Sequence, residues 1–165
     1  GTSLTLDQMH SYEIYKILGC TKEEEIDRVF EFFESPHFKR IKPVPGSQEG
    51  IVRLRKDHQL IVITAREQEI AKPTAAWISR YFSDAFSDLY FTGYASNNSE
   101  KKKKADICIS AGVELMIEDS LENISGCAEQ GTRGLLLDYP WNRKSGLSSQ
   151  IQRVYSWPEI VEKIG

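Results

Sequence analysis

The sequence has few of the residues that build metal clusters or disulfide frameworks. It contains three cysteines and three histidines among 165 residues, and no two cysteines have the spacing of a zinc site. Cys20, Cys108 and Cys127 are odd in number, widely separated and set in helix-like patterns. We therefore expect reduced thiols in a core rather than disulfide partners.

The sequence also lacks a long apolar run and an excess of positive charge. No apolar stretch approaches the ~18 residues that mark a membrane-spanning helix, and no signal-peptide pattern is present. The formal net charge is -3, and the single basic run is Lys101 to Lys104. We therefore expect a cytoplasmic protein that has neither nucleic acid nor a membrane as a partner.

What the sequence does contain suits a globular domain, with 40% apolar and 27% charged residues. Four short apolar runs alternate with helix-like segments, and they are expected to be strands at 60–63, 89–92, 115–117 and 135–137. Strands separated by helices predict βαβ units and a mainly parallel sheet. The expected fold class is therefore α/β, a Rossmann-like three-layer fold.

The N-terminal part of the sequence predicts helices without a strand between them. The first is expected from about Asp7 to Leu18, and the second begins at a capping-box pattern of Thr21 with Glu24. Both are rich in aromatic residues. They are expected to form a small helical cap beside the larger domain, or alternatively to pack into its core.

Polar residues follow each expected strand: Thr64 with Arg66, Thr92 with Gly93, Glu118 with Asp119, and Asp138. Parallel strands end at one edge of a sheet, where α/β proteins bind their ligands. A hydroxyl, a lysine and paired carboxylates at such an edge suit magnesium-assisted phosphoryl chemistry. The ordinary alternative is that Thr64 caps a strand end, that Asp119 or Ser120 caps a helix, and that Asp138 forms a turn.

The order of these motifs resembles that of the haloacid dehalogenase-like phosphohydrolase superfamily. The segment Ile61 to Arg66 is similar to the threonine motif of that superfamily, and Met116 to Ser120 is similar to its acidic motif. Lys104 begins a helix in the way the superfamily's lysine does. Because Lys101 to Lys103 precede it, which of the four is the motif lysine stays open.

The resemblance implies roles for the residues at the strand ends. Thr64, Arg66 and Lys104 would bind phosphate, and Glu118 and Asp119 would bind Mg²⁺. Aromatic residues of the cap could stack on a base, although core packing is the usual role of such side chains: Tyr12, Phe33 and Phe38.

A narrower likeness is to the 5'(3')-deoxyribonucleotidase-like branch. It is carried by Phe38 with Pro43 to Gly46, by Leu137 to Arg143, and by Arg153 to Trp157. The similarity covers nearly the whole chain. It implies that residues 1–42 form a helical cap region that covers the substrate, and that residues 43–165 form the α/β core.

The sequence departs from the family at the catalytic motif. Relatives carry an Asp-x-Asp motif on the first, central strand, which supplies the nucleophile and the general acid/base. This sequence has no Asp-x-Asp, and Asp7-Gln8-Met9 is at most a decayed form of it. Without that strand, two central sheet edges would be unpaired. The sheet could close directly, the N-terminal residues could supply a strand, another chain could donate one, or a segment upstream of Gly1 could supply it.

The missing nucleophile leads to two main functional hypotheses. The first is a non-catalytic pseudo-phosphatase, which would bind a small phosphorylated ligand or have a regulatory role. The alternative is a Mg²⁺-dependent phosphohydrolase acting on nucleoside monophosphates or another small phosphoester, its motif coming from upstream of Gly1 or from a partner chain. Expected partners include a second copy or a strand-donating chain. A response-regulator-like phosphoacceptor fits less well, since Glu118 and Asp119 end a late strand.

Overall fold

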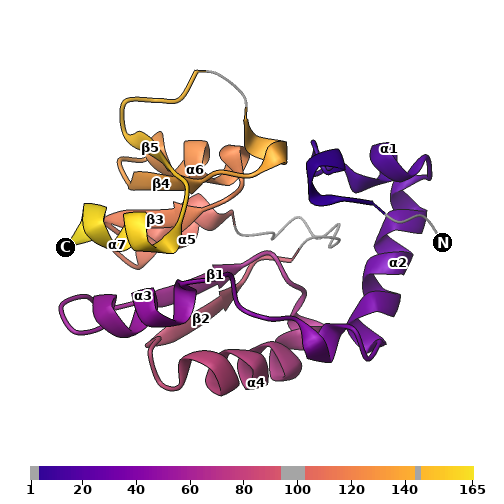
Figure 1. Cartoon of the computed structure of the whole chain (residues 1–165), viewed down its shortest axis with the longest axis horizontal. Coiled ribbons are helices and arrows are strands. Elements are labelled where there is room, and N and C mark those ends of the chain that lie inside the picture. The colour runs from indigo at the N-terminus through magenta and orange to yellow at the C-terminus, as the bar shows by residue number, and fades with distance from the viewer. Residues whose placement is uncertain (1–3, 94–102, 144–145) are drawn as a thin grey trace.

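Helices and parallel strands alternate through most of the chain (Figure 1). The computed structural model describes residues 4–93, 103–143 and 146–165. The polar segment from Tyr94 to Glu100, for which the sequence predicts an exposed loop, lies outside these ranges. The strands are β1 (Ile61–Thr64), β2 (Asp88–Phe91), β3 (Leu115–Glu118), β4 (Arg133–Leu137) and β5 (Ile151–Val154). The helices between and beside them are α3 (Ser47–Leu54), α4 (Ala71–Phe82), α5 (Lys104–Ser110), α6 (Leu121–Ala128) and α7 (Trp157–Ile164), with a 3-10 turn η3 (Gln68–Ile70). The predicted α/β fold class is confirmed.

The strands form two parallel sheets instead of one. In the first, β1 pairs with β2, with Ile61 opposite Asp88. In the second, β4 lies between β3 and β5, with Leu115 opposite Arg133 and Gly134 opposite Ile151. Within the described residues, β1 and β3 are not hydrogen-bonded to each other. Direct closure of the sheet is therefore not how this structure accommodates the missing first strand.

The hydrophobic core surrounds β4. Leu136 packs with Ile124 of α6 on one face of the sheet. Leu135 and Leu137 pack with Ile160 of α7 on the other. Successive residues of a strand point to opposite faces, so this run of leucines fills both sides and produces the three-layer arrangement.

Two local features complete this core. A Cβ on Gly134 would lie 2.6 Å from the Ile124 side chain, so α6 needs a glycine there to approach the sheet. Cys108 and Cys127 are buried and free, with their sulfurs 3.6 Å apart, as expected of thiols in a core. Cys20 is free and half-buried.

The β1 strand is less buried than its sequence predicts. The run Leu60 to Ile63 is typical of a buried strand, yet all four residues of β1 are only half-buried. The physical reason is that one edge of β1 has no neighbouring strand among the described residues. The sequence pattern of β1 therefore indicates an environment with more neighbours than the described residues supply.

The N-terminal segment is helical but irregular. It contains a 3-10 turn η1 (Leu6–Gln8), α1 (Ile14–Leu18), α2 (Lys22–Glu34) and a second turn η2 (Phe38–Arg40). The prediction of one helix from Asp7 to Leu18 is wrong, because side chains bind the backbone in competition with helical hydrogen bonds. Gln8 accepts from the Thr5 backbone N–H at 2.8 Å, and Ser11 accepts from that of Glu13 at 3.0 Å.

The start of α2 is as predicted. The Thr21 hydroxyl accepts from the Glu24 backbone N–H at 3.2 Å, and the Glu24 carboxylate accepts from the Thr21 backbone N–H at 2.9 Å. This capping box satisfies two donors at the helix end. The N-terminal residues that the structure describes do not form a replacement strand, because residues 4–18 consist of turns, extended segments and α1.

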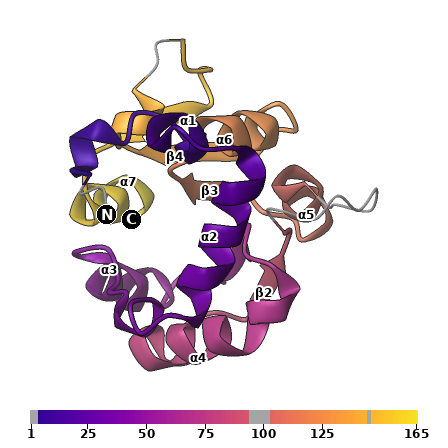
Figure 2. The same cartoon turned by 90° about the vertical axis from the view of Figure 1, so that its right-hand side faces the viewer.

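The N-terminal helices lie at one end of both sheets. They stand at the right of Figure 1, and Figure 2, viewed from that side, shows α2 crossing in front of the sheets. Tyr12 contacts Trp141 of the turn η4 (Pro140–Asn142), while α2 lies over the residues that follow β1. The segment thus bridges the two sheets at the carboxyl ends of their strands. Among the described helices, none is long and apolar enough to span a membrane.

Candidate functional site

A buried ion pair joins the lysine and acidic motifs. Lys104 begins α5 and Glu118 ends β3, and the Lys104 Nζ lies 2.5 Å from the Glu118 Oε2. Their side chains are 10% and 7% exposed. Burial raises the pKa of Glu118, and nearby Asp119 raises it further, while Lys104 acts in the opposite direction. Of the two lysines of this run that the structure describes, Lys103 and Lys104, the second is the one paired with the acidic motif, whereas Lys101 and Lys102 lie outside the described residues.

The second oxygen of Glu118 is also occupied. Its Oε1 accepts hydrogen bonds from the backbone N–H groups of Asp119 at 3.3 Å and Ser120 at 3.1 Å. Ser120 in turn caps α6 by accepting from the Asn123 backbone N–H at 3.3 Å. The capping alternative therefore applies to Ser120. It does not exclude an ordered carboxylate at Glu118, whose two oxygens are both hydrogen-bonded.

Asp119 is the carboxylate of the pair that faces the cap. Burial, the Asp119 charge and hydrogen bonding to Asp119 all raise the pKa of Tyr12. The Tyr12 ring also meets Trp141 edge-on, with centroids 5.7 Å apart. One cap residue is thus held directly against the acidic motif, and sequence reasoning had considered Tyr12 only as a stacking or packing residue.

The backbone of Asp119 is fixed by the turn after β4. Its carbonyl oxygen accepts from the Trp141 Nε1 at 3.2 Å and from the Asn142 Nδ2 at 2.8 Å. Asn142 is fully buried and also donates to the Leu137 carbonyl at 2.7 Å. Sequence reasoning missed the role of Asn142. Its only signal was membership of the segment Leu137 to Arg143, which carried the family resemblance.

Asp138 also stabilises the turn η4. Its carboxylate accepts from Arg153 at 2.8 Å and from Arg143 at 3.0 Å. Arg153 also donates to the Asn142 side chain at 2.7 Å. The strand-end carboxylate of β4 is therefore committed to anchoring the η4 turn.

The threonine motif is ordered by its own backbone. The Thr64 hydroxyl accepts from the Arg66 backbone N–H at 3.2 Å. The Arg66 guanidinium donates to the Thr74 hydroxyl at 3.2 Å and lies 5.2 Å from the centre of the Phe38 ring. Burial lowers the pKa of Arg66. Phe38 itself is buried against Phe33 and supports this arrangement as a packing residue.

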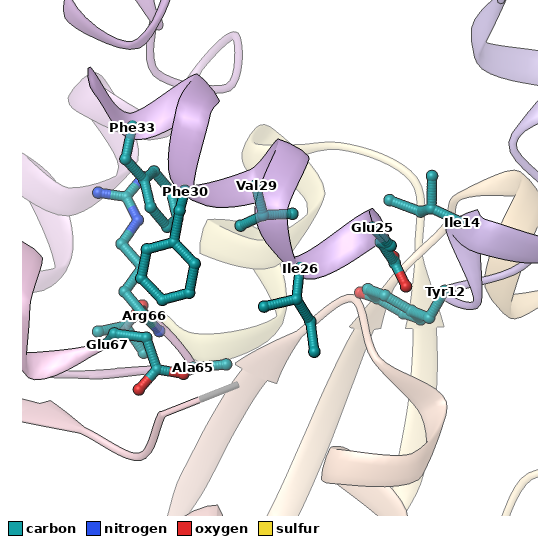
Figure 3. A pocket seen from close by; sticks show the side chains of 11 residues that line it. Tyr12, Ile14, Glu25, Ile26, Val29, Phe30, Phe33, Ala65, Arg66 and Glu67 are labelled. Atoms are coloured by element: carbon teal, nitrogen blue, oxygen red, sulfur yellow. The ribbon is translucent and has the colours of Figure 1, made fainter. Parts of the chain in front are cut away.

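A pocket of about 270 Å³ lies between the cap and the carboxyl end of β1. Figure 3 shows α2 forming one wall and the residues after β1 forming the opposite wall. The lining is mostly apolar on the α2 side: Ile26, Val29, Phe30 and Phe33. Thr64 and Tyr12 both line it, so the pocket connects the threonine motif with the residue that touches Asp119.

A second cavity, of about 740 Å³, separates the two sheets. We call it the inter-sheet slot. Its sides include Leu60 to Ile63 on the β1 side and Glu114 to Glu118 on the β3 side. Its remaining walls combine apolar side chains with polar and charged ones. The apolar side chains include Ile51, Leu54, Phe82, Phe86, Trp157 and Ile164, and the polar and charged ones include His58, Gln59, Asp88, Arg133 and Lys163. The slot reaches Glu118, and so ends at the acidic motif.

Comparison with known proteins assigns the chain to a family. Residues 2–164 match the family described as 5' nucleotidase, deoxy (pyrimidine), cytosolic type C protein (NT5C). The chain belongs to this family. It is 27% identical over 162 residues to a nucleotidase of Clostridium acetobutylicum, a match that covers 96% of this chain and 78% of that protein.

Solved structures share the fold of this chain. A haloacid dehalogenase-like family hydrolase from Streptococcus pneumoniae matches with a TM-score of 0.64 and 13% identity, covering 99% of this chain and 83% of that one. Protein tyrosine kinase A (PtkA) of Mycobacterium tuberculosis matches with a TM-score of 0.70 and 16% identity, covering 100% and 83%. At these identities the structures show the fold alone. Together with the family match, the resemblance to a nucleotidase-like member of the haloacid dehalogenase-like superfamily is confirmed.

The superfamily generally uses Mg²⁺, and the residues of this NT5C family member fit that ion in part. Mg²⁺ is commonly held by one or two carboxylates together with water and substrate phosphate. Asp119 suits this role. Glu118 would first have to release Lys104, since its other oxygen holds two backbone N–H groups. Within the part of the chain that the structure describes, no three histidine, cysteine or acidic residues cluster as a metal site.

Proposed function

We propose that this chain binds a small phosphorylated ligand and hydrolyses it only when a strand carrying the missing aspartates fills the inter-sheet slot. The chain without that strand is then a binding or regulatory pseudo-phosphatase. Completed by a segment joined upstream of Gly1, or by a partner chain, it is a Mg²⁺-dependent phosphohydrolase for nucleoside monophosphates or another small phosphoester. The observation that carries the proposal is the slot between β1 and β3.

The slot has the chemistry that an added strand requires. Unpaired backbone groups at a sheet edge favour pairing with another strand, and both β1 and β3 offer such an edge toward the slot. The apolar side chains among its walls, such as Leu54, Phe86 and Trp157, would cover the side chains of an apolar strand. A strand parallel to β1 would end between Thr64 and Asp119, so aspartates at its carboxyl end would join the site.

The residues already in the chain would position the ligand. Thr64 and Lys104 are suited to phosphate oxygens, as a hydroxyl donor and a buried cation respectively. Arg66 would contribute only after leaving Thr74. Mg²⁺ bound at Asp119 would offset the negative charge of the phosphate. The nucleophile must come from the added strand, because the chain contains no Asp-x-Asp motif.

Complementation tests this proposal. The chain is assayed for Mg²⁺-dependent phosphate release from deoxynucleoside monophosphates and p-nitrophenyl phosphate, alone and with an apolar peptide ending in Asp-x-Asp. A fusion of the same peptide upstream of Gly1 removes the dependence on peptide affinity. We expect release only in the completed forms, and none when the peptide ends in Asn-x-Asn.

The outcomes separate the two halves of the proposal. Appreciable release by the chain alone would contradict the pseudo-phosphatase part. A fusion that folds but releases no phosphate would contradict the complementation part. A fusion that carries Asp119→Asn should lose most of its Mg²⁺ response, whereas Asp84→Asn in the α4–β2 turn is the matched control and should retain it.

A further inference from the structure

Glu25 is a buried carboxylate that the proposed chemistry does not use. It lies in the first half of α2, is 3% exposed, and its Oε2 has no hydrogen-bond partner among the described residues. The neighbouring Glu23 of the same helix is exposed. Buried polar atoms are nearly always hydrogen-bonded, because leaving one unpaired destabilises the fold. An unpaired acceptor in a pocket therefore indicates a missing donor.

The position of Glu25 shows where that donor would lie. Glu25 lines the 270 Å³ pocket under α2, together with Thr64 from the opposite wall. In Figure 3 its carboxyl group is turned toward the pocket beside the Tyr12 ring, and Ile26 and Phe30 extend along the same side. A ligand whose phosphate lies at Thr64 would extend beneath the apolar side chains of α2 and meet Glu25.

The shape and lining of the pocket limit the ligand. Drug-sized ligands usually occupy pockets of roughly 300–1,000 Å³, so a pocket of about 270 Å³ suits a single ring system. Apolar walls suit the faces of a flat ring. A bare sugar would place several hydroxyl groups against those walls without partners, which is unfavourable.

We propose that Glu25 is a specificity-determining residue that accepts a hydrogen bond from an N–H group on the ring of a bound nucleoside monophosphate. This inference rests on the proposed function for its phosphate end at Thr64. It adds a single acceptor, the Glu25 carboxylate, as the group that recognises the ring. Glu25 would then discriminate among phosphoesters by whether they carry a ring N–H.

Calorimetric binding to the intact chain in the presence of Mg²⁺ tests the inference. The probes are dTMP and dGMP, whose bases carry a ring N–H, and dCMP, whose ring nitrogens carry no hydrogen. Deoxyribose 5-phosphate is the reference without a base. We expect at least one nucleotide to bind about 10-fold or more tightly than the reference, the size typical of a hydrogen bond to a charged group. Glu25→Gln should reduce this preference to about threefold or less, whereas the exposed control Glu23→Gln should keep it.

A second measurement needs no substitution in the protein. Methylation of the ring N–H of the preferred nucleotide should remove the preference in the unmutated chain, even if Glu25→Gln fails to fold. If deoxyribose 5-phosphate binds as tightly as the nucleotides, the role of Glu25 is overturned and the phosphate site remains supported. The same holds for a preference that survives both Glu25→Gln and methylation. If neither nucleotides nor the reference bind, the phosphate site of the proposed function fails, and the inference fails with it.

Discussion

The two halves of the molecule differ in how completely their strands are surrounded. In the three-stranded half, β4 lies between two strands and two helix layers, and Leu136 is fully buried. In the two-stranded half, every residue of β1 is half-buried although its sequence is equally apolar. The difference shows that an apolar sequence indicates the buried environment that suits a strand, even where the strand is only half-buried in the structure. The environment of β1 is incomplete on the side that faces the inter-sheet slot.

The largest expected effect comes from breaking the buried ion pair. Lys104→Met leaves Glu118 buried without its cation, and loss of one partner of a buried pair typically costs about 3–5 kcal/mol of unfolding free energy. Lys72→Met, at an exposed position of α4 in the two-stranded half, should change the unfolding free energy by no more than about 0.5 kcal/mol. Urea denaturation measures both. Equal losses would mean that the pair is effectively solvated.

Truncation of one apolar side chain in each half compares their packing directly. Leu136→Ala should reduce the unfolding free energy by about 2–5 kcal/mol, as for other fully buried aliphatic residues. Ile61→Ala should cost clearly less, because Ile61 is half-buried beside the slot. A strand supplied to the slot should increase the cost of Ile61→Ala and leave that of Leu136→Ala unchanged. Similar costs for the two variants without added strand would contradict the comparison.

A polar residue in each half provides a smaller contrast. Asn142→Ala removes the amide that donates to the buried Leu137 carbonyl and to the half-buried Asp119 carbonyl, so we expect a loss of roughly 1–3 kcal/mol in unfolding free energy. Gln59→Ala removes an exposed hydrogen bond to Ser87 in the two-stranded half, where surface changes are usually within about 0.5 kcal/mol. Thermal unfolding of the two variants tests this order. A reversed order would show that the η4 turn contributes little to stability.

The smallest effect concerns the contact that joins the cap to the three-stranded half. Because the pKa of Tyr12 is raised in the folded chain, its stabilising contribution is present below the ordinary tyrosine pKa of about 10 and is lost as pH rises above it. Ultraviolet titration of the wild type against Tyr12→Phe isolates this phenol. Asp119→Asn should lower the pKa of Tyr12 toward its ordinary value. A pKa unaffected by Asp119→Asn would show that the cap does not rest on the acidic motif in solution.

Local structure was largely predictable because short-range chemistry specifies it. The capping box of Thr21 with Glu24 and the Ser120 cap depend on residues three positions apart. The alternation of strands and helices follows from apolar runs and their spacing. The split of the first predicted helix was missed, since side-chain bonds from Gln8 and Ser11 outweigh an apolar pattern that is only partly helical.

The candidate site was only partly predictable. The sequence could place Thr64, Arg66, Lys104, Glu118 and Asp119 after strands or at the start of a helix, and their functional roles stay predictions. It could not show that Arg66 turns toward Thr74, or that Lys104 neutralises Glu118. These contacts depend on side-chain directions between distant segments.

The sequence by itself determined the α/β class, the family and the absence of an Asp-x-Asp nucleophile, because each is written in the order and type of nearby residues. Only the tertiary structure decided that two sheets stand apart around the inter-sheet slot, and that Tyr12 lies against Asp119. It also decided that Glu25 is buried without a partner among the described residues. The physical reason is that burial and unpaired edges are properties of how segments far apart in sequence pack together.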